Sequence, residues 1–197
     1  MYSKNPRQAL ELALEGPGLA VDAGHLSSPA NSVSLLNVAS AGISGLVDLL
    51  VNANPRQGGG AFLAATLTAL RQNRGQWVAV QLDGWSVVTG LALLVAVANG
   101  KSFGKGMRVA PNARLDNGRL DVVVVEALPW RRLLLRLPLL YLGRHLRLPQ
   151  VRFRQGERVL LEVEGSSPPF DVDGECYAAG PATFSVRSRA WHIAWAF

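Results

Sequence analysis

The sequence predicts an α+β domain built on an antiparallel, sandwich-like sheet with about three helices. Apolar residues make up 49% and charged residues 17% of the 197 residues, which suits one domain with a sizeable core. The 20 Gly and 11 Pro are scattered along the chain, as is typical of short strands joined by tight turns. Strands and helices do not alternate, which argues against a doubly wound parallel sheet.

The expected elements follow from these patterns in chain order. Helical spacing of apolar residues or strong helix formers predict helices at 43–51, 61–72 and 129–146. Asp83-Gly84 predicts a two-residue turn between its flanking strands. Gly58–Gly60 is interpreted as a connection, because no Lys-Ser/Thr pair follows it as in a phosphate loop. The strand-like segments are 19–23, 32–39, 76–82, 85–98, 106–110, 121–127, 150–154, 158–163, 170–172, 183–187 and 191–195, and 9–15 fits a short strand or helix.

The charge of the chain predicts an anionic neighbour. The formal net charge is +6 and the pI is about 10.2. Nucleic acid is not the expected partner, because there is no zinc-ligand spacing and no aromatic-basic RNA-binding pattern. The longest apolar run, 87–98, is shorter than the ~20 residues of a membrane span, and the single Cys176 suits a reducing compartment. We therefore expect a cytoplasmic protein, with peripheral membrane association as a further option.

Closely spaced glycines follow the long strand at 85–98. Asn99 and Gly100 end the apolar run, and Gly104 and Gly106 lie two residues apart shortly afterwards. Such glycines permit close approach of the backbone to a phosphate or to a neighbouring strand. A plain turn explains the same residues equally well.

The segment 114–121 also has two interpretations. Asn117 and Gly118 form a typical turn pair. Carbonyl and side-chain oxygens alternating around a tight turn are also ligands that Mg²⁺ accepts. The residue types alone favour the plain turn.

Three carboxylates lie within five residues at Asp171, Asp173 and Glu175. In an extended segment they would share one face of the strand. Like charges so close together repel, so a metal ion, a basic group or a proton has to offset them. The cluster is the strongest candidate for acid–base or metal chemistry, with an exposed acidic turn as the alternative.

Read together, these segments resemble the C-terminal domain of the diacylglycerol kinase catalytic family, which includes bacterial lipid kinases and the sphingosine and ceramide kinases. The similar motifs are Asn99-Gly100 with Phe103–Met107, the loop 111–121, and Val172–Glu175. Upstream, 21–24 and 36–42 resemble the segments that open the same domain. The similarity extends over nearly the whole chain.

The resemblance implies phosphoryl transfer from ATP to a lipid hydroxyl. Asp173 matches the general base of the family, and Glu175 would help to place a metal ion or hydrogen bonds around it. Asn117 stands where the family has an acid, which weakens the expected Mg²⁺ site. The implied ATP-binding residues are Asn99, Gly100, Gly104 and Gly106, and the implied Mg²⁺ ligands are the carbonyls of Arg114 and Arg119 and the side chain of Asn117, with Asp116 as an alternative.

The Gly-Gly-Asp-Gly-Thr nucleotide motif of that family has no match in this sequence. We therefore expect residues 1–197 to form a single substrate-side domain that is inactive alone. It would be either a fragment of such a kinase or a partner that meets a nucleotide-binding domain in trans. A non-catalytic lipid-binding or regulatory module is the main alternative, and a homodimer formed through the exposed inter-domain face is a weaker one.

The segment 129–149 predicts a membrane-facing element. It contains five arginines and no acidic residue, and its leucines give it an apolar face. A basic amphipathic helix of this kind binds an anionic lipid surface. A core-packed helix with solvated arginines is the alternative. The three histidines show no metal-site spacing, and His145 in particular is interpreted as an ordinary surface or strand residue.

Overall fold

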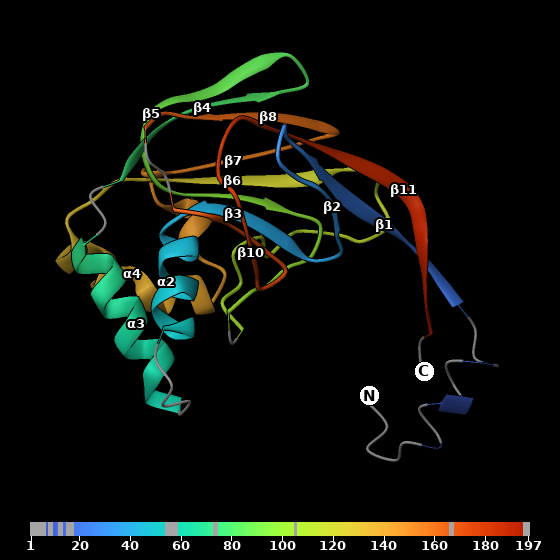
Figure 1. Ribbon diagram of the computed structural model, residues 1–197, viewed down its shortest axis with the longest axis horizontal. Helices are drawn as coiled ribbons and strands as arrows, with labels where there is room; N and C mark the ends of the chain where they lie inside the picture. Colours follow the sequence, from blue (N-terminus) through green and yellow to red (C-terminus); the bar gives the residue numbers. More distant parts are fainter. Residues whose placement is uncertain are drawn as a thin grey trace.

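The structure is a computed structural model that describes residues 18–53, 59–72, 75–104, 106–165 and 168–194, together with positions 7, 10, 11 and 14. From residue 18 onward it forms one curled, antiparallel sheet of eleven strands with three α-helices at one end (Figure 1). The predicted α+β class is confirmed. The strands are β1 Gly18–Ser27, β2 Ser32–Leu35, β3 Val38–Gly42, β4 Gln76–Leu82, β5 Trp85–Ala98, β6 Leu120–Glu126, β7 Val151–Gly156, β8 Arg158–Val163, β9 Phe170–Val172, β10 Glu175–Tyr177 and β11 Ala182–Ala194. The helices are α2 Ile43–Asn52, α3 Gly59–Gln72 and α4 Trp130–Tyr141, with a short 3₁₀ turn, η1, at His145–Arg147.

The strand β5 is the branch point of the sheet. The main path runs β10-β9-β3-β5-β4-β8-β11-β1-β2, while β6 pairs with β5 and carries β7. The first half of β5 pairs with β4, and its second half pairs with both β3 and β6. This arrangement curls the sheet and brings β3 and β9 beside the end of β5.

The second half of β5 is buried on both faces, because two cores lie on opposite sides of it. Val95 and Val97 pack into the main core inside the curled sheet, which is closed by the edge-to-face pair Phe170 and Phe184 with ring centroids 6.3 Å apart. Leu94 and Ala96 face a second core between the sheet and the helices. This explains the continuous apolar run of the sequence, which an exposed face would have interrupted.

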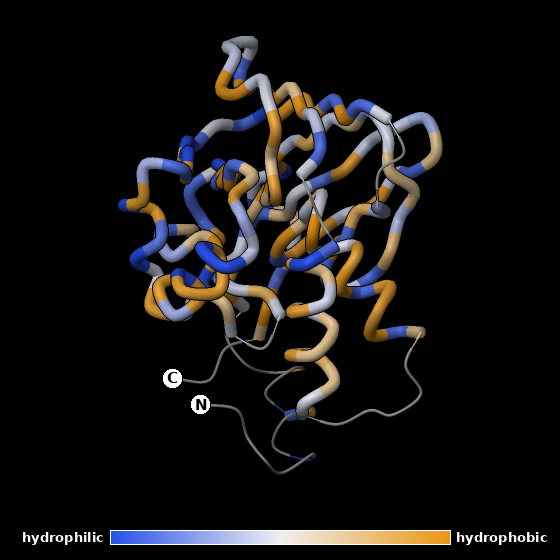
Figure 2. The backbone as a smooth tube through the Cα atoms, turned by 90° about the vertical axis from the view of Figure 1, so that its left-hand side faces the viewer, coloured by the Kyte–Doolittle hydropathy of each residue, from blue (hydrophilic) through white to orange (hydrophobic). Residues whose placement is uncertain are grey.

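Hydrophobic residues follow the strands of the sheet and the helices beneath it (Figure 2). Helices α2 and α3 pack on each other through Val47, Ala65 and Ala69. None of the residues of α4 is fully buried. The helical end of the molecule is therefore packed less tightly than the sheet.

Several sequence predictions are corrected by the structure. The predicted strand 32–39 is two strands separated by a turn at Leu36-Asn37, and 183–187 and 191–194 belong to one strand, β11. The predicted strand 106–110 is a loop, because Phe103 and Met107 pair across a tight turn. Gly59 and Gly60 begin α3. Positions 54–58, 105 and 195 and most of 9–15 lie outside the described residues.

Candidate functional site

The turn between β2 and β3 gathers several of the predicted site residues. The backbone carbonyl of Asn37 accepts hydrogen bonds from the N–H groups of Asn99 (2.8 Å) and Gly100 (2.7 Å). The Asn37 side-chain amide donates to the carbonyl of Ser102 at 2.6 Å. We call residues Leu36–Val38 the β2–β3 turn; it connects the loop after β5 to the acidic hairpin described below.

Asn99 is fully buried, and its Nδ2 donates at 2.8 Å to the carbonyls of Asp22 and of Leu36. A Cβ atom at Gly100 would collide with the side-chain oxygen of Asn37. The close backbone approach predicted for Gly100 is therefore present, and its partner in this structure is the β2–β3 turn. Whether Asn99 and Gly100 also contact a nucleotide stays a prediction.

Gly104 and Gly106 shape the loop that follows. Both have positive φ angles, 44° and 91°, which glycine adopts without strain. The loop is closed by paired backbone hydrogen bonds between Phe103 and Met107 of 3.0 and 3.1 Å. The glycines thus serve the turn interpretation, and their predicted contact with ATP is not tested by these contacts.

Asp173 lies at the turn between β9 and β10 and binds the β2–β3 turn. Its carboxylate accepts backbone hydrogen bonds from Leu36 (2.7 Å), Asn37 (3.1 Å) and Val38 (2.8 Å). Its own N–H donates to the Val38 carbonyl at 3.0 Å. The carboxylate is thereby held in one orientation on an exposed edge, where it remains open to solvent.

The acidic cluster does not share one face, and that expectation was wrong. Asp173 and Gly174 have φ angles of 52° and 92° and form a tight hairpin turn instead of an extended strand. Asp171 points inward and is buried, whereas Asp173 and Glu175 are exposed. Glu175 lies on the opposite strand of the hairpin, beside Val172.

The predicted Mg²⁺ loop forms a turn that is held by hydrogen bonds to Asp22 of β1. The Asp22 carboxylate accepts the N–H groups of Gly118 (2.6 Å) and Arg189 (2.8 Å). Asn117 Oδ1 accepts the N–H of Arg119 at 3.1 Å, as in an Asx turn. Asp116 forms an exposed ion pair with Arg114.

These contacts engage both side-chain oxygens that the Mg²⁺ prediction invoked. No group of three or more His, Cys, Asp or Glu side chains comes together as a metal site in the described part of the chain. In this structure Asn117 and Asp116 thus make their contacts within the loop itself. The assignment of Arg114, Asn117 and Arg119 as ligands stays a prediction, and no step is derived through the ion.

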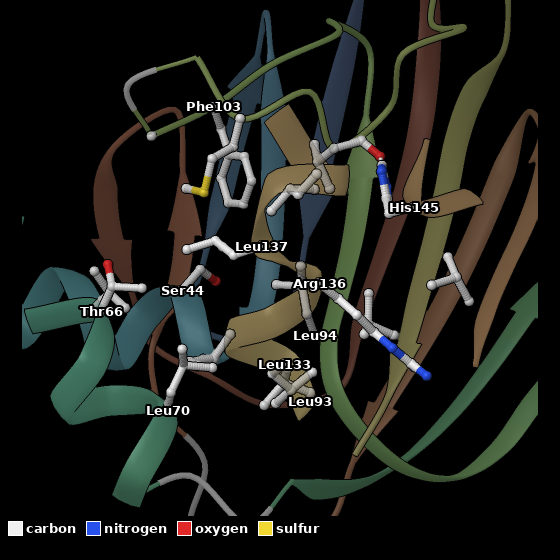
Figure 3. Close-up of a pocket in the computed structure, with 18 of the residues that line it drawn as sticks. Ser44, Thr66, Leu70, Leu93, Leu94, Phe103, Leu133, Arg136, Leu137 and His145 are labelled. Carbon is white, nitrogen blue, oxygen red and sulfur yellow. Dashed lines mark hydrogen bonds between the residues drawn. The ribbon is translucent and has the colours of Figure 1, made fainter. Parts of the chain in front are cut away.

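An apolar cavity of about 150 Å³ lies between the three helices and strands β5 and β6. Figure 3 shows side chains of α3 and α4 facing each other across it, with Phe103 at one end. Its wall is aliphatic and aromatic, and includes Val47, Phe62, Leu94, Met107, Leu137 and Leu140. A wall of this kind suits an apolar ligand group.

A pair of carboxyl groups lines one part of this cavity. Burial, reinforced by the charge of Asp171 and by a hydrogen bond to its carboxyl group, raises the pKa of Asp48 to about 7. Burial also raises the pKa of Asp171, against a hydrogen bond from the Gly174 N–H. Asp48 Oδ2 is buried without a hydrogen-bond partner among the described residues. The hydroxyls of Ser40 and Ser44 lie 2.7 Å apart, and Ser44 also lines the cavity.

His145 is another polar residue of the cavity wall, which corrects its interpretation as an ordinary surface or strand residue. It is 4% exposed, and its Nε2 lies 3.0 Å from the Val109 carbonyl. Burial lowers the pKa of His145. The neutral imidazole is thus the favoured form at neutral pH.

Fold and site together define an α+β domain in which helices enclose an apolar cavity beside an acidic hairpin. Residues 37–195 match the family described as the YegS C-terminal NAD kinase beta sandwich-like domain. The chain therefore belongs to this family, and its predicted membership of the C-terminal domains of the diacylglycerol kinase family is confirmed.

Curated relatives carry the same family name, and a solved structure has the same fold. The diacylglycerol kinase of Mycobacterium tuberculosis (strain CDC 1551 / Oshkosh) is 26% identical over 97% of this chain and 62% of its own length. That of Staphylococcus carnosus (strain TM300) is 26% identical over 90% and 56%. A crystal structure of a diacylglycerol kinase from Bacillus anthracis str. Sterne superposes with a TM-score of 0.67 at 21% identity, covering 98% of this chain and 62% of that one. The chain thus spans less than two thirds of the proteins that it matches.

Sequence reasoning did not single out Asp48, and it noted Asp22 and Asn37 only as parts of segments that resemble the family, without a role. Asp22 and Asp48 are single acids within otherwise apolar segments, and such a residue is buried only when it has a partner. That signal was available in the sequence. The partners were not, because they lie far away along the chain.

Proposed function

We propose that this chain is the lipid-side domain of a diacylglycerol- or sphingosine-type kinase and acts with a nucleotide-binding domain. The observation that supports this most is the apolar cavity with the carboxyl pair Asp48 and Asp171 in its wall. Asp171 is two residues along the chain from the exposed Asp173. A lipid tail would occupy the cavity, and its hydroxyl would lie at the acidic hairpin. Phosphoryl transfer requires this kind of positioning above all.

In this proposal Asp173 is the general base. It takes the proton of the lipid hydroxyl as the hydroxyl oxygen attacks the γ-phosphorus of ATP, and the bond to the bridging oxygen breaks to release ADP. The three backbone N–H groups from the β2–β3 turn orient the carboxylate for this contact. Glu175, exposed on β10, would contribute to the electrostatics of the same edge.

The experiment joins the chain to the N-terminal part of the Staphylococcus carnosus relative and measures ATP-dependent phosphorylation of diacylglycerol and of sphingosine in mixed micelles. Asp173→Asn should lower kcat by about 10²- to 10⁴-fold, the usual contribution of a general base. Glu162→Gln removes an exposed acid on β8 and should leave kcat within about twofold. Thermal unfolding of each variant separates a lost base from a lost fold. Retained activity in a folded Asp173→Asn protein would sink the assignment.

One observation favours the second candidate, a non-catalytic lipid-binding module. The Asp173 carboxylate already accepts three backbone hydrogen bonds, so it also has a structural task. If the joined protein binds lipid but transfers no phosphate to either substrate, this second function is the correct one.

A further inference from the structure

The outer face of α4 presents apolar side chains to solvent. Four residues of α4 line the cavity: Leu133, Arg136, Leu137 and Leu140. Their spacing places them on one side of the helix. The opposite side carries Leu134, Leu135, Pro138, Tyr141 and Leu142, all of them exposed. Leu135 and Leu142 are 81% and 59% exposed. Because the inner face of α4 lines the cavity, the outer stripe of apolar side chains is a separate surface.

Arginines flank the stripe at both of its ends. Arg131 and Arg132 precede it, Arg144 and Arg147 follow it, and all four are exposed. No Asp or Glu occurs in 129–149. Arg108 is exposed close by, where its backbone N–H donates to the carbonyl of Leu140 at 3.2 Å.

We propose that this outer face of α4 docks on the surface of an anionic lipid bilayer. The apolar stripe would enter the boundary between headgroups and acyl chains, and the arginines would bind lipid phosphates around it. A second copy of the chain fits this face less well, because the same arginines would oppose each other across a twofold interface. Nucleic acid fits less well because the centre of the face is apolar. No described helix is long and apolar enough to cross a membrane.

The two faces of α4 give the docking a consequence for the cavity. A helix with its side chains is about 10 Å thick. A docked α4 would therefore hold the cavity within one helix diameter of the bilayer, so that a lipid chain could enter without crossing water. This consequence rests on the proposed lipid function, whereas the docking itself does not.

The test measures partitioning of the 197-residue chain onto sedimented vesicles of phosphatidylcholine, with and without phosphatidylglycerol. Binding should need the anionic lipid and weaken with salt. Arg131→Gln with Arg132→Gln should reduce partitioning about tenfold or more. Arg158→Gln with Arg187→Gln removes the same charge from exposed sites on β8 and β11 and should change it less than about twofold.

A fluorescent label locates the docked face. In a Cys176→Ser background, an environment-sensitive dye on Leu135→Cys should shift to the blue on anionic vesicles, while the same dye on Trp85→Cys, at the start of β5, should not. Equal binding to neutral vesicles, equal losses in the two arginine pairs, or equal shifts at the two labels would each overturn the proposal. So would a stable dimer, or a nucleic-acid complex, that Leu135→Asp dissociates. Vesicle binding needs no ATP, so it succeeds or fails independently of the kinase assay.

Discussion

At the scale of single residues, the carboxyl pair Asp48 and Asp171 is the most sensitive part of the site to pH. Two partly buried acids in contact cannot both ionise without repulsion, so the pair keeps a proton to higher pH than an isolated carboxyl. The proton makes the pair a hydrogen-bond donor as well as an acceptor.

This proton makes the stability of the fold depend on pH. The unfolded chain ionises Asp48 from about pH 4, whereas the folded chain holds the proton to about pH 7. The unfolded state therefore binds fewer protons in this window, and the free energy of unfolding falls as the pH rises through it. Asp48→Asn mimics the protonated acid and should recover about 1–2 kcal/mol at pH 8 relative to pH 4, since the group is partly exposed and coupled. Denaturant unfolding at both pH values measures this difference, and parallel behaviour of both proteins would contradict it.

The residues that the sequence did reveal are those with a local signature. Asn99-Gly100 stands out because it ends a long apolar run, and Asp173 stands out because it belongs to three carboxylates within five residues. The burial of Asp171, however, depends on the hairpin that turns it inward, and the extended interpretation put it on the wrong face. The hydrogen bonds between Asp22 and the loop at Gly118 join segments 96 residues apart, a distance that no local pattern reports.

At the scale of elements, periodicity predicted strands and helices well, and loops poorly. The Asp83-Gly84 turn has φ angles of 50° and 86°, as a two-residue hairpin turn requires. The segment 106–110 was predicted as a strand and is a loop. In the structure the cross-turn pairing of Phe103 with Met107 takes up the local hydrogen bonds and leaves the segment irregular.

The β2–β3 turn lies so close to the loop after β5 that only glycine fits at position 100 without a collision. Gly100→Ala would place a methyl group against Asn37 and should lower the free energy of unfolding by about 1–3 kcal/mol. Gly60→Ala is the matched control, because its Cβ would meet no atom within 4 Å and α3 gains helix propensity. We expect the control to be neutral or slightly stabilising in denaturant titrations. Equal effects of the two substitutions would contradict the close-packing argument.

At the scale of the whole molecule, sheet and helices have different tasks. The curled sheet holds the acidic hairpin and the β2–β3 turn in register, while the three helices enclose the cavity against strands β5 and β6. The sequence predicted both parts, yet the cavity itself could not be predicted. It arises where α3 and α4, separated by more than fifty residues, meet over the sheet.

The two sides of α4 allow the cavity to be tested with one helix. Leu137→Trp fills the cavity from the inner face and should weaken binding of a short-chain fluorescent lipid, kept below its micelle concentration, by tenfold or more. Leu135→Trp places the same ring on the exposed side and should bind the lipid like the unaltered chain. Similar affinities for the two variants would show that the lipid binds elsewhere.

The β2–β3 turn also bears on how the chain folds. Its hydrogen bonds reach Ser102, 65 residues away, and Asp173, 136 residues away. Loops of that length close only after β5 and β9 have both joined the sheet. We therefore expect the amide hydrogens of Leu36, Asn37 and Val38 to gain protection from solvent exchange late in folding, once the sheet is complete.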